Sequence, residues 1–152
     1  MDKRFDDLCE RLFDAPCWVV DIFPRQVPAE RDRAYFAVER LLTKEEPLTA
    51  LYRRFSRLVL KLSCYYDLVL GVLPEMVWNE DPDPETLCRQ IEACAAPPQT
   101  GGVRVLLPDE DAMLTLDAGD LWLTLYHPGA ELKRTVGALA ASEGLFLREG
   151  QS

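Results

Sequence analysis

The sequence predicts an α+β fold in which one mostly antiparallel sheet carries helices packed on one or both faces. Residues 103–126 consist of short apolar runs separated by turn signals, which is typical of antiparallel strands joined by short connections. Several other segments repeat apolar residues at helical spacing. A chain of 152 residues can form one buried core, so we expect a single domain over residues 1–152. The expected order is α-β-α-α-β-α-β-β-β-α-β.

The N-terminal segment predicts a helix followed by a strand. Residues 3–14 place their apolar side chains on one helical stripe, and Pro16 ends the helix. Residues 17–23 are rich in Trp, Val and Ile and predict a strand. Asp21 interrupts this apolar run, so we expect either that one face of the strand is wet or that Asp21 has a specific role.

Two nearly contiguous helices follow. Pro28 suits the first turn of the second helix, whose expected buried stripe is Tyr35, Val38, Leu41 and Leu42. Thr43 and Glu46 match a capping box that would begin the third helix. This third helix, over residues 45–64, has the cleanest amphipathic pattern of the chain. Its expected buried stripe is Leu48, Leu51, Tyr52, Phe55, Leu58, Val59 and Leu62.

The middle of the chain predicts a strand, a loop and a short helix. Residues 65–72 predict the strand, and residues 74–82 predict a loop that holds Trp78. Asp83 is a suitable N-cap and Pro84 a suitable first helical residue. The stripe of this helix is expected to be Leu87, Cys88, Ile91 and Cys94, ending before Pro97 and Pro98.

The last third of the chain predicts a three-stranded meander, a helix and a closing strand. The strands are expected over 103–107, 112–116 and 121–126, with turns at 108–111 and 117–120. A helix is expected from about Gly129 to Glu143, with Gly144 at its C′ position, before a strand over 145–148. A strand–helix–strand run of this length can form a right-handed parallel crossover.

Acidic residues concentrate in the second half of the chain. Residues 1–72 carry twelve Lys or Arg and twelve Asp or Glu, whereas residues 73–152 carry five against fourteen. The net charge of -9 therefore comes from the second half, which repels nucleic acid and anionic lipid. We expect no nucleic-acid partner and no membrane partner. No apolar run approaches the ~18–20 residues of a membrane span, and residues 1–7 lack the apolar core of a signal peptide.

The cysteines and the missing motifs argue against a metal or a cofactor. The five cysteines are odd in number and include no C-x-x-C pair, so we interpret them as reduced thiols of a cytoplasmic protein. The chain contains no phosphate-binding or dinucleotide-binding glycine motif. Asp81, Asp83, Glu85 and Glu92 match a calcium-loop template only superficially, since Thr86 replaces its glycine. We expect no metal site and no cofactor.

His127 is the single histidine and the weak catalytic candidate of the chain. Antiparallel pairing of the meander would place it at the same sheet end as Asp109, Glu110 and Asp111, where a histidine–carboxylate pair could serve acid–base chemistry. Cys17 is the one cysteine that could pair with His127 as a nucleophile. The more favoured interpretation is structural, with the acids in a solvated turn and His127 opening a helix.

Arg53, Arg54, Arg57 and Lys61 form the basic face of the third helix, opposite its apolar stripe. This face is the candidate interaction surface. Because the second half has surplus acid and must pack on the first, we expect partial pairing of these cations with second-half carboxylates. Trp78 is a further interaction candidate, since a loop tryptophan among prolines and acids often lies at a contact surface.

The leading functional hypothesis is a non-catalytic cytoplasmic interaction or regulatory domain that uses its acidic second half to meet a basic protein partner. Its support is the charge partition and the lack of an assembled catalytic set. The alternative is a small enzyme or small-molecule binder with a site near His127 and the turn 109–111. A small acidic α+β domain without a motif is a pattern shared by many unrelated adaptors, regulators and toxin-neutralising proteins, which is an analogy of fold only.

Overall fold

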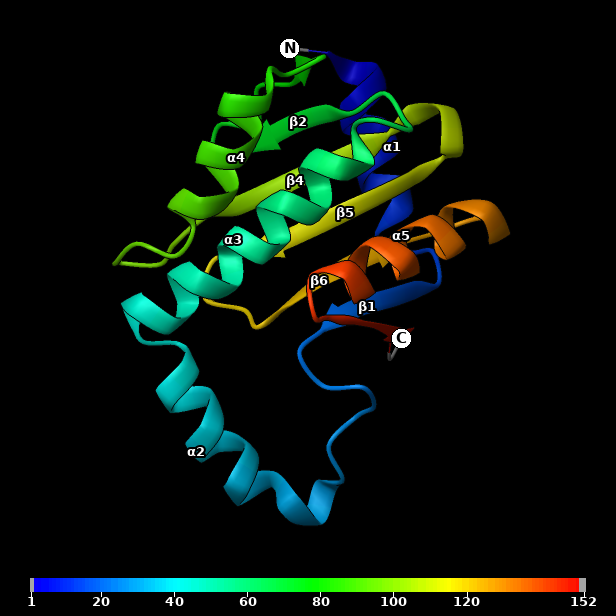
Figure 1. Cartoon of the computed structure of the whole chain (residues 1–152). Helices are drawn as coiled ribbons and strands as arrows, with labels where there is room; N and C mark the ends of the chain where they lie inside the picture. Colours follow the sequence, from blue (N-terminus) through cyan, green and yellow to red (C-terminus); the bar gives the residue numbers. More distant parts are fainter. Residues whose placement is uncertain (1, 151–152) are drawn as a thin grey trace.

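The computed structural model describes residues 2–150 and contains one seven-stranded sheet with helices on both faces (Figure 1). Neighbouring strands are antiparallel throughout, in the order β3-β2-β4-β5-β6-β1-β7, which confirms the predicted fold class. The strands are β1 (Cys17–Asp21), β2 (Val69–Val72), β3 (Asn79–Glu80), β4 (Gly102–Leu107), β5 (Ala112–Asp117), β6 (Trp122–Tyr126) and β7 (Phe146–Glu149). The helices are α1 (Lys3–Leu12), α2 (Asp32–Leu42), α3 (Glu45–Leu62), α4 (Pro84–Ala93) and α5 (Ala130–Ser142). Among residues 2–150, no helix is both long and apolar enough to cross a membrane.

Strands β4, β5 and β6 form the predicted meander. Gly102 lies opposite Asp117 across β4 and β5, and Met113 lies opposite Tyr126 across β5 and β6. Strand β1 then pairs with the free side of β6, and β7 pairs with β1. Because β6 and β7 are both antiparallel to β1, they run parallel to each other. Helix α5 connects them, so the chain crosses over β1 as the strand–helix–strand pattern indicated.

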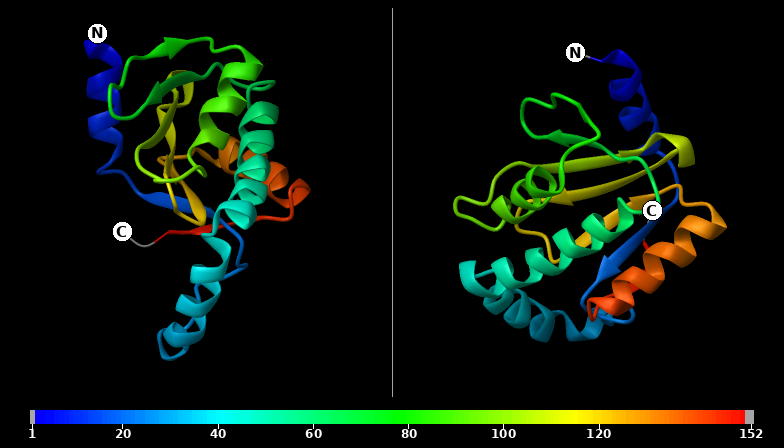
Figure 2. Two further views of the ribbon diagram at one scale, coloured as in Figure 1. Left: turned by 90° about the vertical axis from the view of Figure 1, so that its left-hand side faces the viewer. Right: turned by 45° about the horizontal axis from the view of Figure 1, so that its top comes forward.

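The main core lies between one face of the sheet and the helices α3, α4 and α5 (Figure 2, left). The seven residues predicted as the stripe of α3 are all buried, which confirms this prediction. Alternate residues of the strands complete the core, because successive side chains of a strand point to opposite faces. At its centre the Tyr52 hydroxyl donates to the Asp120 carbonyl at 2.7 Å and accepts from the Gly119 amide at 2.9 Å.

Helix α1 covers only part of the second face of the sheet. It packs over β2, β4 and β5 and forms a smaller cluster with Phe5, Cys9, Leu12, Val69, Leu106 and Met113. Figure 2 shows α1 on the side of the sheet opposite to α3. Within residues 2–150 no helix packs on this face over β6, β1 and β7, so this half remains open.

The predicted buried stripe of α2 is wrong. No residue of α2 is buried, and the side chain of Leu41 is 57% exposed. A short 3₁₀ helix, η1 (Ala29–Arg31), precedes α2, and the two project beyond the end of the sheet (Figures 1 and 2). The apolar spacing is present in the sequence, but the fold places little against it other than the start of α3.

The predicted capping box at Thr43 is also wrong. Thr43 ends α2, and its hydroxyl donates to the Glu39 carbonyl at 2.8 Å. Lys44 is the residue that precedes α3, without a side-chain cap. The hydroxyl of Thr43 therefore serves the last turn of one helix and is not available to begin the next.

Smaller differences concern the middle of the chain. The predicted strand over 65–72 is shortened to β2, because the amides of residues 63–66 continue the turn at the end of α3. The predicted loop 74–82 contains the two-residue strand β3. Asp83 caps α4 as expected, and its side chain accepts from the Thr86 amide at 2.8 Å.

Removal of the Phe55 ring should destabilise the protein. Phe55 is fully buried between α3 and the sheet, so Phe55→Ala leaves a cavity and should lower the free energy of unfolding by about 3–5 kcal/mol. The matched control Phe36→Ala removes a phenyl ring from the exposed surface of α2 and should change the free energy of unfolding by less than about 0.5 kcal/mol. Urea denaturation followed by circular dichroism measures both. Equal midpoints for the two variants would contradict the assignment of α3 to the core.

Candidate functional site

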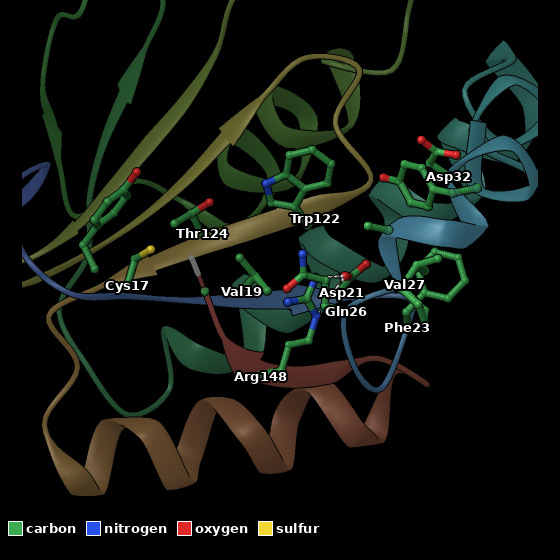
Figure 3. A pocket seen from close by; sticks show the side chains of 15 residues that line it. Cys17, Val19, Asp21, Phe23, Gln26, Val27, Asp32, Trp122, Thr124 and Arg148 are labelled. Carbon is green, nitrogen blue, oxygen red and sulfur yellow. Dashed lines mark hydrogen bonds and ion pairs between the residues drawn. The ribbon is translucent and has the colours of Figure 1, made fainter. Parts of the chain in front are cut away.

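The open half of the second sheet face forms one wall of a cavity of about 420 Å³ (Figure 3). The opposite wall is the segment 23–29 together with the first turn of α2. The strands contribute Cys17, Val19, Asp21, Trp122, Thr124, Tyr126 and Arg148. The opposite wall contributes Phe23, Gln26, Val27, Pro28, Ala29, Asp32 and Tyr35. A cavity of this volume, with apolar and aromatic walls and a few polar groups, is the candidate binding site.

Strand register explains why these side chains meet. Every second residue of β1 and of β6 faces the cavity, while Val20, Leu123 and Leu125 between them enter the main core. Across the two strands, Val19 lies opposite Thr124 and Asp21 lies opposite Trp122. The cavity wall is thus a set of cross-strand pairs on one face of the sheet.

A buried ion pair forms the floor of the cavity. Asp21 is 5% exposed, and its Oδ2 accepts from Arg148 Nη2 at 2.6 Å and from Arg148 Nε at 3.2 Å. Its Oδ1 accepts from the Ile22 amide at 2.7 Å. The two charges balance each other, as buried charges in proteins generally must. The specific role expected for Asp21 is therefore to hold β7 against β1.

The end of the cavity next to α2 is aromatic and acidic. The rings of Phe23 and Tyr35 lie 6.0 Å apart, and the Tyr35 hydroxyl donates to Glu39 at 3.3 Å. Burial raises the pKa of Tyr35 to about 12, and the negative charges of Glu39, Asp21 and Asp120 act in the same direction. Asp32 lines the cavity and has no ion-pair partner within residues 2–150.

Asp120 adds a titratable carboxyl near this end. It lies between β5 and β6, where burial, together with the charges of Asp117 and Glu39, raises the pKa of its carboxyl to about 6. The carboxylate also contributes to the raised pKa of Tyr35, which places it within electrostatic reach of the cavity. The negative charge at this end therefore increases as the pH rises through about 6.

His127 meets one of the carboxylate residues expected near it. Its Nδ1 lies 2.8 Å from the Asp111 carbonyl and 3.7 Å from the Asp111 carboxylate. That carboxylate is bound by Arg11, and the hydrogen bond from Arg11, together with its charge, holds the pKa of Asp111 below its usual value. Asp109 is exposed in the same turn, and Glu110 lies beside it, half-buried.

The surroundings of His127 do not form a pocket with it. Its imidazole is 51% exposed and does not line the 420 Å³ cavity. Cys17 does line that cavity, where it lies opposite Tyr126. In the described part of the chain, no group of three or more histidine, cysteine or acidic residues is arranged to hold a metal ion.

The basic face of α3 is largely paired inside the molecule. Arg57 Nε and Lys61 Nζ each lie 2.7 Å from an oxygen of Glu143, and Arg53 lies 3.6 Å from Glu92. Both acids belong to the second half of the chain, so the predicted partial internal pairing is confirmed. Arg54 has no ion pair within residues 2–150.

Glu143 is the centre of this network. Its side chain is only 6% exposed, and burial disfavours its charge. The hydrogen bonds from Lys61 and Arg57 outweigh this effect and hold the pKa of Glu143 below its usual value. The two cations thus act mainly to fix α5 on α3.

Trp78 contacts the protein itself. Its Nε1 donates to Asp6 at 2.7 Å, and its ring lies edge-on to Phe5 with the centroids 6.2 Å apart. The ring also covers Gly71, where a Cβ atom would lie 2.6 Å from it. Gly71 must therefore lack a side chain for Trp78 to join α1 to the sheet.

Sequence reasoning did not select Trp122, Thr124, Tyr35 or Arg148 as site residues. One signal could have found part of the cavity. Asp21 and Arg148 are each a charged residue inside a short predicted strand, and a buried charge requires a partner. The aromatic residues gave no such signal, since the apolar side chains of β6 suit either face of a sheet.

Comparison with protein-family models, with curated proteins and with solved structures found no match in any of the three.

Breaking the ion pair between Asp21 and Arg148 should destabilise the folded protein. Arg148→Met leaves the buried Asp21 carboxylate without its cation and should lower the free energy of unfolding by about 3–5 kcal/mol. The double variant Asp21→Asn/Arg148→Met removes both charges and should recover part of this loss. Arg134→Met, on the exposed surface of α5, is the control. Urea denaturation that gives Arg148→Met the same stability as this control would contradict the assigned role.

Asp120 should make stability depend on pH. The pKa of Asp120 is higher in the folded than in the unfolded state. Its contribution to the free energy of unfolding is therefore complete below about pH 4 and is lost as the pH rises through about 6. Asp120→Asn removes this loss and should stabilise the protein at pH 7.5 by roughly 1–2 kcal/mol, because the carboxyl is only half-buried and solvent screens part of the effect, with no difference at pH 4. Urea denaturation at the two pH values measures it. A variant that is less stable than the parent at pH 7.5 would refute this assignment.

Proposed function

We propose that this protein is a non-catalytic interaction module that receives a basic segment of a partner protein between α2 and the open half of the sheet. The observation that carries the proposal is that α2 projects from the fold with apolar side chains exposed, directly beside an acidic cavity. A partner seated there would contact both surfaces together.

Helix α2 supplies the apolar part of the contact. Phe36 is 55% exposed and Leu41 57% exposed, and Val38 is exposed between them. A helix of this length is marginal in water without packing against its apolar side chains. A partner that covers them would stabilise the helix and gain burial of apolar area.

Charge supports a basic partner. The chain carries a net charge of -9, and Asp32, Glu39 and Asp120 lie at the end of the cavity next to α2. The net negative charge of the whole molecule attracts a cationic protein and repels nucleic acid, and these three carboxylates lie where such a protein would be bound. No disulfide joins the five cysteines, all of which lie in the described part of the chain, and this supports a cytoplasmic setting.

The alternative, a small enzyme at His127, has less support. Arg11 already engages the carboxylate of Asp111, and the imidazole is open to solvent outside the cavity. A general base needs a substrate pocket in hydrogen-bond reach, and the cavity that the fold provides lies elsewhere.

Acidic substitutions on α2 should abolish partner binding without unfolding the protein. Val38→Glu/Leu41→Glu places charge on exposed positions, so stability should change little while the apolar contact is lost. Affinity capture from the native cells, at about 50 mM and about 500 mM salt, should recover a partner that weakens at high salt. The double variant should fail to recover it.

The matched control is Val77→Glu, an exposed valine in the loop before β3. It adds the same charged side chain away from α2 and should retain the partner. If no salt-sensitive partner is recovered, or if the double variant recovers the same proteins as the parent, the proposed function is wrong.

A further inference from the structure

We infer that the 420 Å³ cavity binds the cationic side chain of an arginine or lysine presented by a peptide segment. This inference rests on the proposed function and specifies what the partner must carry. It follows from three properties of the cavity walls, namely the aromatic rings, the balance of charges and the polar groups without partners.

Aromatic rings stand on both walls. Trp122 lies on β6, while Phe23 and Tyr35 lie on the wall across from it. The face of an aromatic ring attracts a cation, and the attraction grows when water is excluded from around the pair. Aromatic rings from two different elements of the lining therefore favour a flat or compact cation at the end of a long side chain.

The charges around the cavity leave a negative surplus. Arg148 is the cationic residue of the lining, and its Nε and Nη2 donate to Asp21 while Nη1 donates to the Glu149 carbonyl. Its charge is thereby balanced by Asp21, and three of its N–H groups are engaged by the protein. Asp32 remains as a lining carboxylate with no ion pair in residues 2–150, and Glu39 and Asp120 act on Tyr35 nearby.

Basic residues of the neighbouring segment lie outside the lining of the cavity, whose charged residues are Asp21, Asp32 and Arg148. Arg25, Arg31 and Arg33 lie in or next to the segment that forms the second wall, but none of them lines the cavity. A cation that enters meets aromatic faces and the carboxylate of Asp32, whereas an anion would be repelled by Asp32 and would meet an Arg148 whose charge Asp21 already balances. The chemistry favours a guanidinium or an ammonium group.

Polar groups on β6 suit the backbone that carries this side chain. Trp122 Nε1 and the Thr124 hydroxyl lie two residues apart on the same face, and neither has a hydrogen-bond partner among the described residues. Both can donate to a peptide carbonyl. The cavity is at the small end of the roughly 300–1,000 Å³ range of ligand pockets, which suits one long side chain.

Nuclear magnetic resonance of the whole ¹⁵N-labelled protein tests this inference directly. The chain has three tryptophans, and Trp122→Phe identifies the indole signal of Trp122. Titration with Nα-acetyl-arginine methylamide should shift the Trp122 signal to saturation and leave those of Trp18 and Trp78 in place. Nα-acetyl-citrulline methylamide has nearly the same shape without the charge and should produce no saturable shift.

Two substitutions on the exposed helix α2 separate the contribution of charge to arginine binding from that of the aromatic ring, and both leave the core unchanged. Asp32→Asn should weaken arginine binding about two- to fivefold, and Tyr35→Leu should weaken it by a similar factor. Asp67→Asn makes the same chemical change after α3, far from the cavity along the sheet, and should leave binding unchanged. Equal binding of citrulline and arginine, or equal affinity of Asp32→Asn and the parent, would overturn the inference.

The outcomes also separate this inference from the proposed function. If a salt-sensitive partner is recovered through α2 but capped arginine leaves the Trp122 signal unchanged, the interaction module stands and the arginine site is wrong. If capped arginine saturates the Trp122 signal and Asp32→Asn weakens it, the cation site is supported even when no partner is captured. In that case the proposed protein partner is what fails.

Discussion

The pairing of β1 between β6 and β7 is the constraint on which the candidate site depends. This strand, from the first part of the chain, is hydrogen-bonded on both sides by strands from the last part. The register sets Val19 against Thr124 and Asp21 against Trp122, and it brings Arg148 to the buried carboxylate. A slip of one residue would turn the core-facing side chains of β1 into the cavity and the charged Asp21 into the core. The buried ion pair therefore favours one register over its neighbours.

Unequal coverage of the two sheet faces gives the protein its open surface. Three helices pack on one face, whereas α1 occupies the other face only over β2, β4 and β5. The sheet is therefore held by a complete core on one face, while half of its other face carries no helix among residues 2–150. Helix α2 stands at the border of the open half with no residue buried, and the acidic end of the cavity lies below it. Exposed apolar side chains and carboxylates thus lie side by side on two adjoining parts of the fold.

Local sequence patterns predicted the helices and strands of this fold better than they predicted the contacts between them. The stripe of α3, the cap of α4 at Asp83 and the meander follow from spacing and turn chemistry within a few residues, and all are present. The prediction that the apolar stripe of α2 is buried was wrong, because residue spacing identifies an apolar face but not whether another element covers it. The cavity could not be predicted, since its floor joins Asp21 to a residue 127 positions away. The sequence did single out Asp21, because a charge in an apolar strand needs a partner.

The position of β7 has a consequence for the order in which the protein is made. Every other strand of the sheet is translated before Phe146–Glu149, and chains fold from the N-terminal end as they emerge from the ribosome. Until β7 arrives, β1 is an edge strand with an unpaired side, and Asp21 has no guanidinium. The contacts of α3 and α4 with β2, β4 and β5 can form earlier, whereas the residues that α5 adds to the core arrive just before β7. The nascent chain therefore gains the cation that pairs with Asp21, and the last strand of the cavity wall, only at the end of its synthesis.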